Sequence, residues 1–184
     1  MPELRLANGF ARLDALEARL CVPFNGIARV PAVRRYFAAV SRLGDGVAWY
    51  AMLCVLPLVF GKTAIWPTLH IGITALVVVV VHKVLKANLV RERPFASHDE
   101  VVLMAPPLDR YSFPSGHTMH AMAFTVMLLP YFPGVMLIML PFAVSVAVSR
   151  IALGLHYPSD VAAGALIGWA LARLSLLIPP LLGL

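Results

Sequence analysis

The chain has 184 residues, of which 60% are hydrophobic and 13% are charged, and its mean hydropathy is +0.84. Soluble globular domains carry about 25% charged residues, so this composition excludes an ordinary soluble protein and indicates a single-domain membrane protein. The net charge of +6 is not gathered into one basic patch beside aromatic residues. Nucleic-acid binding is therefore not expected, and anionic membrane lipid is the better partner for these charges.

Residues 1–43 form a segment that differs from the rest of the chain. Its apolar residues recur at helical spacing, and they are Leu6, Phe10, Leu13, Leu16 and Leu20, while charged residues such as Asp14 and Glu17 fall elsewhere. This pattern predicts an amphipathic helix that lies in the membrane interface. The alternative is a solvated amphipathic helix packed on the rest of the protein. A cleaved signal peptide is not expected, because no continuous apolar region follows the basic start.

Residues 44–184 are predicted to form a membrane-embedded helical bundle. The apolar runs are Val47–Phe60, Ile65–Leu85, Thr118–Phe132, Val135–Ile151 and Val161–Ile178. The first is only fourteen residues long, a length that short spans share with re-entrant segments. The second is rich in valine, but a lone strand cannot satisfy its backbone in lipid, so a helix is expected. The predicted fold is an all-α integral membrane bundle of about five transmembrane helices.

Polar residues gather where these runs begin and end. Lys86 and Arg93 are seven residues apart, a spacing that places both on nearly one face if the helix continues. Pro114 and Ser115 stand where the third helix must begin, so the backbone N–H groups from Gly116 onward are available to an anion.

A third polar group follows the fourth run. Arg150 ends that run, Pro158 keeps His156 out of a regular helix, and Asp160 falls in the first turn of the fifth helix. One loop joins the second and third runs, and the third and fourth form a hairpin. All three polar groups are therefore predicted to lie on the same side of the membrane.

This combination of side chains fits phosphoryl transfer, in which cations hold the phosphoryl oxygens and catalysis is mostly positioning and charge stabilisation. One His can attack phosphorus while a carboxylate fixes its tautomer, and the other His can protonate the leaving oxygen. The residues alone leave open which His attacks. A metal site of two His and one Asp is disfavoured, because three nearby cations would repel a divalent ion. A Ser-His-Asp hydrolase would leave those cations without a role.

The three groups together resemble the complete signature of the type-2 phosphatidic acid phosphatase family, lipid phosphate phosphatases related to vanadium haloperoxidases. Three separated motifs at the family's spacing are more specific than any one of them. The matching residues are Lys86, Arg93 and Pro94; Pro114, Ser115, Gly116 and His117; and Ser149, Arg150, His156 and Asp160.

The resemblance implies roles for these residues. His156 would be the nucleophile that forms a phosphohistidine, Asp160 would orient it, and His117 would be the general acid. The implied phosphate ligands are Lys86, Arg93, Ser115, Gly116 and Arg150. The family uses no metal and no organic cofactor, so none is expected here.

Other polar residues are expected to lie outside the catalytic set. Lys83 and Arg91 match no signature position and are expected to attract anionic headgroups. His70, His82, His98 and His120 are expected to be ordinary buried or loop residues. Gly164, Gly168 and Ala172 recur at four-residue intervals in the fifth helix and predict a small-residue face that packs against the bundle.

The expected activity is hydrolysis of a phosphomonoester or diphosphate of a polyprenyl lipid or glycerolipid. The alternatives are a lipid phosphotransferase with the same intermediate and a non-catalytic lipid-binding membrane protein. With five spans, every one of the 15 Lys and Arg residues except Lys62 and Arg173 lies on the side of the N-terminus and the catalytic face. The positive-inside rule therefore predicts a multi-pass protein of the cell (inner) membrane whose active site faces the cytoplasm. The resemblance implies the opposite orientation, because many bacterial members of the family have one more span before the amphipathic segment, which turns their catalytic face outward.

Overall fold

A computed structural model describes residues 3–178, with side chains from Leu13 onward. The side chains of Leu6 and Phe10, and residues 179–184 of the predicted bundle, lie outside the described part. Over the described residues the protein is helical and contains no strand.

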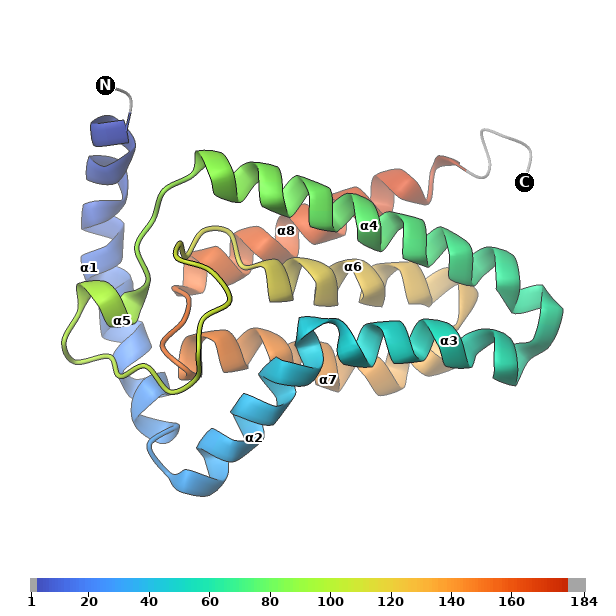
Figure 1. The fold of residues 1–184 in the computed structure, drawn as a ribbon, viewed down its shortest axis with the longest axis horizontal. Helices are drawn as coiled ribbons and strands as arrows, with labels where there is room; N and C mark the ends of the chain where they lie inside the picture. The colour runs from blue at the N-terminus through green and yellow to red at the C-terminus, as the bar shows by residue number, and fades with distance from the viewer. Residues whose placement is uncertain (1–2, 179–184) are drawn as a thin grey trace.

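Five helices pack side by side, and in chain order they are α3 (Ala48–Phe60), α4 (Ile65–Asn88), α6 (Gly116–Tyr131), α7 (Pro133–Ala152) and α8 (Pro158–Ser175). They coincide closely with the five predicted apolar runs. Helix α6 is central, because it contacts α4, α7 and α8 (Figure 1). Its buried side chains include Phe124, whose ring stacks on Trp49 of α3 with centroids 4.9 Å apart. Aromatic stacking of this kind adds to the burial energy of the bundle core.

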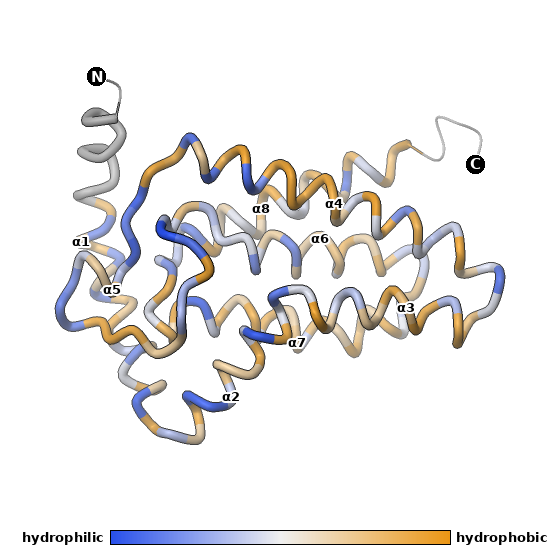
Figure 2. Tube along the Cα trace, in the orientation of Figure 1, coloured by the Kyte–Doolittle hydropathy of each residue, from blue (hydrophilic) through white to orange (hydrophobic). Residues whose placement is uncertain are grey.

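The outer surface of the bundle is apolar. Figure 2 shows hydrophobic residues along α3, α4 and α7, with hydrophilic residues concentrated at the end where the loops gather. Exposed apolar side chains on α4 and α7 include Leu69, Ile73, Leu76, Val80, Leu137, Ile138 and Val144. By length and hydropathy two helical stretches qualify as membrane spans, Pro31–Asn88 and Pro133–Ala152. A broad exposed apolar surface of this kind marks contact with lipid rather than water.

Residues 3–42 contain two helices, α1 (Glu3–Ile27) and α2 (Pro31–Arg42), rather than one continuous helix. Helix α1 lies across the end of the bundle, not along it (Figure 1). Leu16 and Leu20 on α1 are exposed, whereas Glu17, Cys21 and Asn25, which follow one another at four-residue intervals, are buried against the protein. The apolar stripe thus faces outward, and the face that carries Glu17 and Asn25 packs against α7, α8 and the short helix α5 (Pro94–Ser97).

The connection from α2 to α3 is a π-helical turn, η1 (Leu43–Val47), and a 3₁₀ turn, η2 (Gly61–Ala64), joins α3 to α4. Within η1, Gly46 has φ of 133°, a conformation that side chains other than glycine rarely adopt. The long segment between α4 and α6 contains the short helix α5 (Pro94–Ser97), which contacts α1. These connections place Asp45 of η1 and the loop around α5 at the polar end of the bundle.

The small-residue face of α8 packs directly against α6, as predicted. A Cβ atom added to Gly164 would lie 2.5 Å from the carbonyl oxygen of Ser115, and one added to Gly168 would lie 2.2 Å from that of Met119. Only glycine allows two helix backbones to approach so closely. This contact fixes the start of α8 beside the start of α6.

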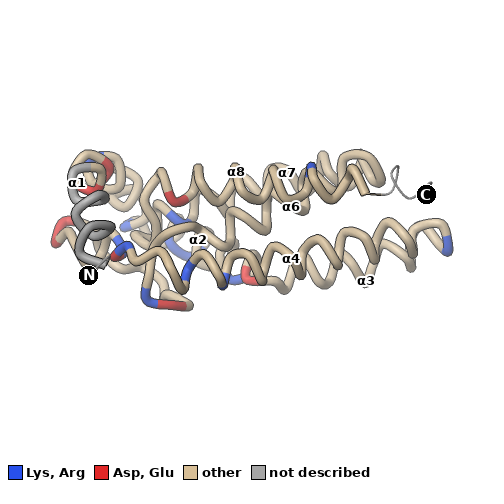
Figure 3. Tube along the Cα trace, turned by 90° about the horizontal axis from the view of Figure 1, so that it is seen from above, with Lys and Arg blue, Asp and Glu red and all other residues tan. Residues whose placement is uncertain are grey.

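Most Lys and Arg residues lie at the end of the bundle that carries α1 and α2, as Figure 3 shows from above. The three polar groups of the sequence lie at this same end. The structure therefore places the basic residues and the candidate site together.

Candidate active site

A cavity of about 290 Å³ opens among η1, α3, α4, α6 and the loops at the polar end. Six of the eight predicted site residues line it: Lys86, Arg93, Gly116, His117, Arg150 and His156. The remaining two, Ser115 and Asp160, are fully buried behind its wall. Helices distant in sequence thus converge on one small cavity, and several of its lining side chains are charged.

His156 lies in the tight turn between α7 and α8. Gly154 has φ of 75° and reverses the chain, and the carbonyl oxygen of Arg150 then accepts the N–H groups of both Leu155 and His156 at 3.0 Å. Pro158 begins α8 immediately afterwards, because proline is well suited to the first turn of a helix. The imidazole is held in a fixed turn with 1% of its surface exposed.

The two ring nitrogens of His156 face different partners. Nε2 lies 3.4 Å from Nη1 of Arg93, whereas Nδ1 lies 3.5 Å from Oγ of Ser112 and 3.7 Å from Oδ2 of Asp160. Burial, reinforced by the charges of Arg150 and Arg93, holds the pKa of His156 well below its usual value. The ring is therefore neutral at physiological pH, and one nitrogen keeps a free lone pair.

Asp160 is held by hydrogen bonds on both carboxylate oxygens. Oδ1 accepts from Nη1 of Arg91 at 2.5 Å, and Oδ2 accepts from the N–H of Tyr157 at 2.7 Å and from the hydroxyl of Ser112. Its position in the first turn of α8 also suits a carboxylate, which is favoured at the positive end of the helix dipole. The carboxylate has little freedom to rotate beside His156.

Lys86 and Arg93 are paired with a carboxylate that the sequence did not predict in the site. Oδ1 of Asp109 accepts from Nζ of Lys86 at 2.8 Å and from Nη2 of Arg93 at 2.7 Å. Burial alone would raise the pKa of Asp109, but the hydrogen bonds from Lys86 and Arg93 lower it below its usual value, so the group is ionised. An anionic group thus occupies the position between two predicted phosphate ligands.

Arg150 and His117 contact each other in the lining of the cavity. Nη1 of Arg150 lies 3.2 Å from Nε2 of His117 and also donates to the hydroxyl of Ser41. Nε2 of His117 contacts Oδ1 of Asp45 as well, a second carboxylate that the sequence did not predict here. Nε of Arg150 is buried and has no hydrogen-bond partner among the described residues. Buried polar groups are normally paired, so this guanidinium N–H is an unsatisfied donor close to the cavity that Arg150 lines.

Ser115 and Gly116 stand at the start of α6, as predicted. Ser115 precedes the first helical residue, and its N–H donates to the carbonyl oxygen of Asp160 at 3.1 Å, which ties α6 to α8. The Ser115 hydroxyl is paired with Thr118 at 3.0 Å and does not line the cavity. Gly116 lines the cavity, whereas Ser115, the other predicted phosphate ligand at this helix start, does not.

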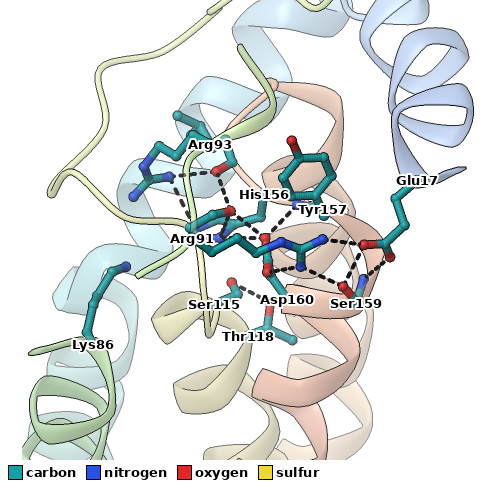
Figure 4. A network of polar contacts seen from close by, with 12 residues as sticks. Glu17, Lys86, Arg91, Arg93, Ser115, Thr118, His156, Tyr157, Ser159 and Asp160 are labelled. Carbon is teal, nitrogen blue, oxygen red and sulfur yellow. Dashed lines mark hydrogen bonds and ion pairs between the residues drawn. The ribbon is translucent and has the colours of Figure 1, made fainter. Parts of the chain in front are cut away.

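Arg91 is not a headgroup-binding surface residue, and that expectation was wrong. Its side chain is fully buried and forms an ion pair with Asp14 of α1. It also pairs with Glu17 of α1 and with Asp160, as Figure 4 shows. Residues 89–93 are not helical, so the alternation of an extended chain turns Arg91 inward together with Arg93. Two features of the sequence could have indicated a buried Arg91. One is this alternation, and the other is the spacing of Asp14 and Glu17, which puts both carboxylates on one face of a helix.

Three of the remaining histidines can be placed relative to the cavity. His82 and His120 are half-buried and line it, and the expectation that they are not catalytic stays a prediction. His70 is hydrogen-bonded to Tyr131 and Ser175 at the far end of the bundle, as expected for a structural residue. The described residues contain no cluster of three or more His, Cys, Asp or Glu side chains arranged to hold a metal ion.

Comparison with known proteins identifies relatives along most of the chain. Residues 66–183 match the family model of the PAP2 superfamily. An undecaprenyl-diphosphatase of Sulfolobus acidocaldarius is 33% identical over 76% of this chain and 67% of its own length. A decaprenylphosphoryl-5-phosphoribose phosphatase of Mycolicibacterium smegmatis is 32% identical over 75% of this chain and 74% of its own. The crystal structure of a transmembrane PAP2 type phosphatidylglycerolphosphate phosphatase from Bacillus subtilis superposes with a TM-score of 0.73, at 24% identity, over 94% of this chain and 89% of that one.

Proposed function

Because this chain belongs to the PAP2 superfamily and is a membrane-associated lipid phosphatase, we propose that it removes a phosphoryl group from a lipid through a phosphohistidine on His156. One observation carries this proposal. The neutral, buried ring of His156 presents Nε2 to a cationic cavity while Nδ1 faces Asp160. A proton held on Nδ1 leaves the lone pair of Nε2 free to attack phosphorus.

The cations around Nε2 support binding of a phosphoryl group. Lys86, Arg93 and Arg150 all line the cavity, and the buried Nε of Arg150 has no hydrogen-bond partner in the part of the chain that the structure describes. Non-bridging oxygens of a phosphoryl group carry spread negative charge, which a preorganised set of guanidinium and ammonium donors stabilises without reorganisation. The N–H groups at the start of α6 add the positive end of a helix dipole.

His117 is the proposed general acid, because it lines the same cavity as His156 and contacts both Arg150 and Asp45. In the first step Nε2 of His156 bonds to phosphorus as the bond from phosphorus to the leaving oxygen breaks, and His117 protonates that oxygen. In the second step His117 takes a proton from water, whose oxygen bonds to phosphorus and releases His156.

The substrate is proposed to be a lipid phosphate or diphosphate on a polyprenyl or glycerolipid carrier. The relatives support this class without selecting one member, since one is named for a diphosphate and another for a phosphorylated sugar lipid. Residues 44–184 are proposed to cross the membrane five times. Residues 1–43 are proposed to lie in the interface, where α1 crosses the bundle end and exposes its leucines.

We further propose that the site faces the cytoplasm from the cell (inner) membrane. The basic residues gathered at the catalytic end support this orientation through the positive-inside rule. A single Cys at Ser97, in a chain with Cys21→Ser and Cys54→Ala, should resist a membrane-impermeant thiol reagent in intact cells. Labelling before lysis would place the catalytic loop outside.

The proposed activity is tested with purified protein, farnesyl diphosphate and dioctanoyl phosphatidic acid as probes, and released phosphate as the readout. We expect phosphate release that survives chelator and is inhibited by vanadate, because the site is built from cations and needs no metal. Activity lost in chelator and restored by magnesium or zinc would contradict the mechanism. Release that depends on an added lipid alcohol, with the phosphoryl group appearing on that alcohol, would indicate a phosphotransferase instead.

A further inference from the structure

Arg91 joins three parts of the chain that are far apart in sequence. It lies in the loop after α4, and its guanidinium reaches Asp14 and Glu17 on α1 and Asp160 on α8, as Figure 4 shows for Glu17 and Asp160. The side chain has no exposed surface, and its guanidinium carbon lies 4.1 Å from the ring centroid of Tyr157. A buried guanidinium with this many partners is fixed in both position and orientation.

Every nitrogen of the guanidinium is used. Nε and Nη2 donate to Oδ1 of Asp14 at 2.9 and 2.7 Å, and Nη2 also donates to Oε2 of Glu17 at 2.6 Å. Nη1 donates to Oδ1 of Asp160 at 2.5 Å and to the hydroxyl of Ser159 at 2.7 Å. The planar fork thus holds two acidic side chains of α1 on one side and the first turn of α8 on the other.

Arg91 also reaches the second oxygen of Asp160 through its backbone. The carbonyl oxygen of Arg91 accepts the N–H of Ser112 at 2.7 Å, and the hydroxyl of Ser112 donates to Oδ2 of Asp160. Oδ2 is the oxygen nearest Nδ1 of His156. One residue therefore fixes both ends of the carboxylate that faces the proposed nucleophile.

Glu17 strengthens the same arrangement from α1. Its Oε1 accepts the N–H of Ser159 at 2.7 Å, and its Oε2 accepts the Ser159 hydroxyl at 2.6 Å. Glu17 therefore holds the first turn of α8, one residue before Asp160, as well as the guanidinium of Arg91. A carboxylate at this place also satisfies a backbone N–H that the helix leaves unpaired.

We propose that Arg91 is a positioning residue for Asp160, and that α1 is a working part of the phosphatase because Asp14 and Glu17 hold Arg91 in place. This inference rests on the proposed function, in which Asp160 orients His156. The family match begins at residue 66, so α1 lies outside it. The helix lies across the bundle end with its leucines outward, and its acidic face fixes the catalytic carboxylate.

The inference predicts a specific kinetic defect. Glu17→Gln keeps the size of the side chain but removes its charge, and we expect kcat to fall about tenfold with KM within about twofold, because supporting hydrogen-bond partners of a catalytic group typically contribute about 10–100-fold. Arg91→Lys, which cannot reproduce the planar fork, should lower kcat by about a hundredfold. The kcat of Arg91→Lys tests the inference only if this variant still unfolds cooperatively on heating. If it does not, the kcat of Glu17→Gln is the test.

Asn25 supplies the matched control. Its buried side chain also ties α1 to the rest of the protein, through the backbone of Val102 at 2.9 Å and Ala152 at 3.1 Å, but it has no contact with Arg91 or Asp160 in the hydrogen-bond network. Asn25→Ala therefore weakens the docking of α1 without touching the carboxylate. A defect that comes only from loosening α1 should appear equally in this variant.

The deciding experiment is a double-mutant cycle on kcat with farnesyl diphosphate. If Arg91 acts through Asp160, Glu17→Gln should cost less than about threefold in an Asp160→Asn background, whereas Asn25→Ala should cost the same factor in both backgrounds. The inference would be overturned if Glu17→Gln lowered kcat by the same factor with Asp160 and with Asn at that position. It would also be overturned if the fall in kcat from Asn25→Ala were likewise smaller in the Asp160→Asn background. Full turnover by His156→Ala would instead overturn the proposed function, so the two failures are distinguishable.

Discussion

Gly168 is the position where the packing of α6 on α8 can be tested with one methyl group. A Cβ at Gly168 would lie 2.2 Å from the carbonyl oxygen of Met119, whereas ordinary contact begins at 3.4 Å. Gly168→Ala therefore requires the two helices to move apart by about the difference, 1.2 Å. Neither atom belongs to a flexible side chain end, so no rotamer change relieves the clash.

The displacement should affect stability and activity together. Overpacking of this kind costs about 1–3 kcal/mol, which in a chain of this size lowers Tm by about 2–12 °C. Met119 lies two residues after His117 on α6, while α8 carries Asp160. A misplacement of about 1 Å in a catalytic arrangement can cost about a hundredfold in rate, so kcat should fall by up to that factor.

The measurement is thermal unfolding in detergent together with phosphate release, for Gly168→Ala and for Gly26→Ala as the control. A Cβ on Gly26, in α1, would meet nothing within 4 Å, and alanine favours a helix, so Tm should stay the same or rise slightly. If Gly168→Ala behaves like Gly26→Ala in both measurements, the small-residue face of α8 does not carry the packing described here.

Three further predictions concern the site. Asp160→Asn should retain a small fraction of phosphate release while His156→Ala retains none, because the first disturbs ring orientation and the second removes the nucleophile; equal residual rates would contradict these roles. Asp109→Asn removes the carboxylate that competes with an anion for Lys86 and Arg93. At about 1 kcal/mol for a partly exposed ion pair, this change should lower the inhibition constant of vanadate about fivefold. Weaker inhibition by vanadate would mean that Asp109 helps to hold the anion. Because the pKa of His156 is lowered in the folded protein, the unfolded chain binds more protons below pH 6.5, so stability should fall as pH decreases below 6.5. His156→Gln should reduce that slope by at most about 1.4 kcal/mol per pH unit, and an unchanged slope would show that His156 is protonated in the folded state.

The helices and most of the site could be predicted from the sequence because their signals are local. Apolar runs set the five bundle helices, Pro158 excludes His156 from a helix, and the glycine spacing in α8 marks the face that meets α6. The division of residues 1–43 into α1 and α2 was not predicted. Both helices are amphipathic, so no continuous apolar run marks where either one begins or ends.

The network around Arg91 could not be predicted in the same way. Its partners on α1 and α8 are 69 to 77 residues away, and no periodicity links them. Asp109 and Asp45 were missed for a related reason, because each comes from a connection whose path depends on the packing of α1, α2 and η1. Loop residues enter a site through tertiary structure, and a pattern of local spacing does not encode that path.

The central claim, that His156 carries the phosphoryl group, is tested most directly by trapping the intermediate. Protein is incubated with farnesyl diphosphate that carries ³²P in the terminal phosphoryl group, the one transferred to His156. After a quench in alkali the protein should retain the label, and acid should release it, as expected for a phosphoramidate bond. We expect peptide analysis to place the label on His156, with none in His156→Ala and more in a His117→Ala variant that hydrolyses the intermediate slowly. Label on another residue, or normal turnover by His156→Ala, would contradict the account.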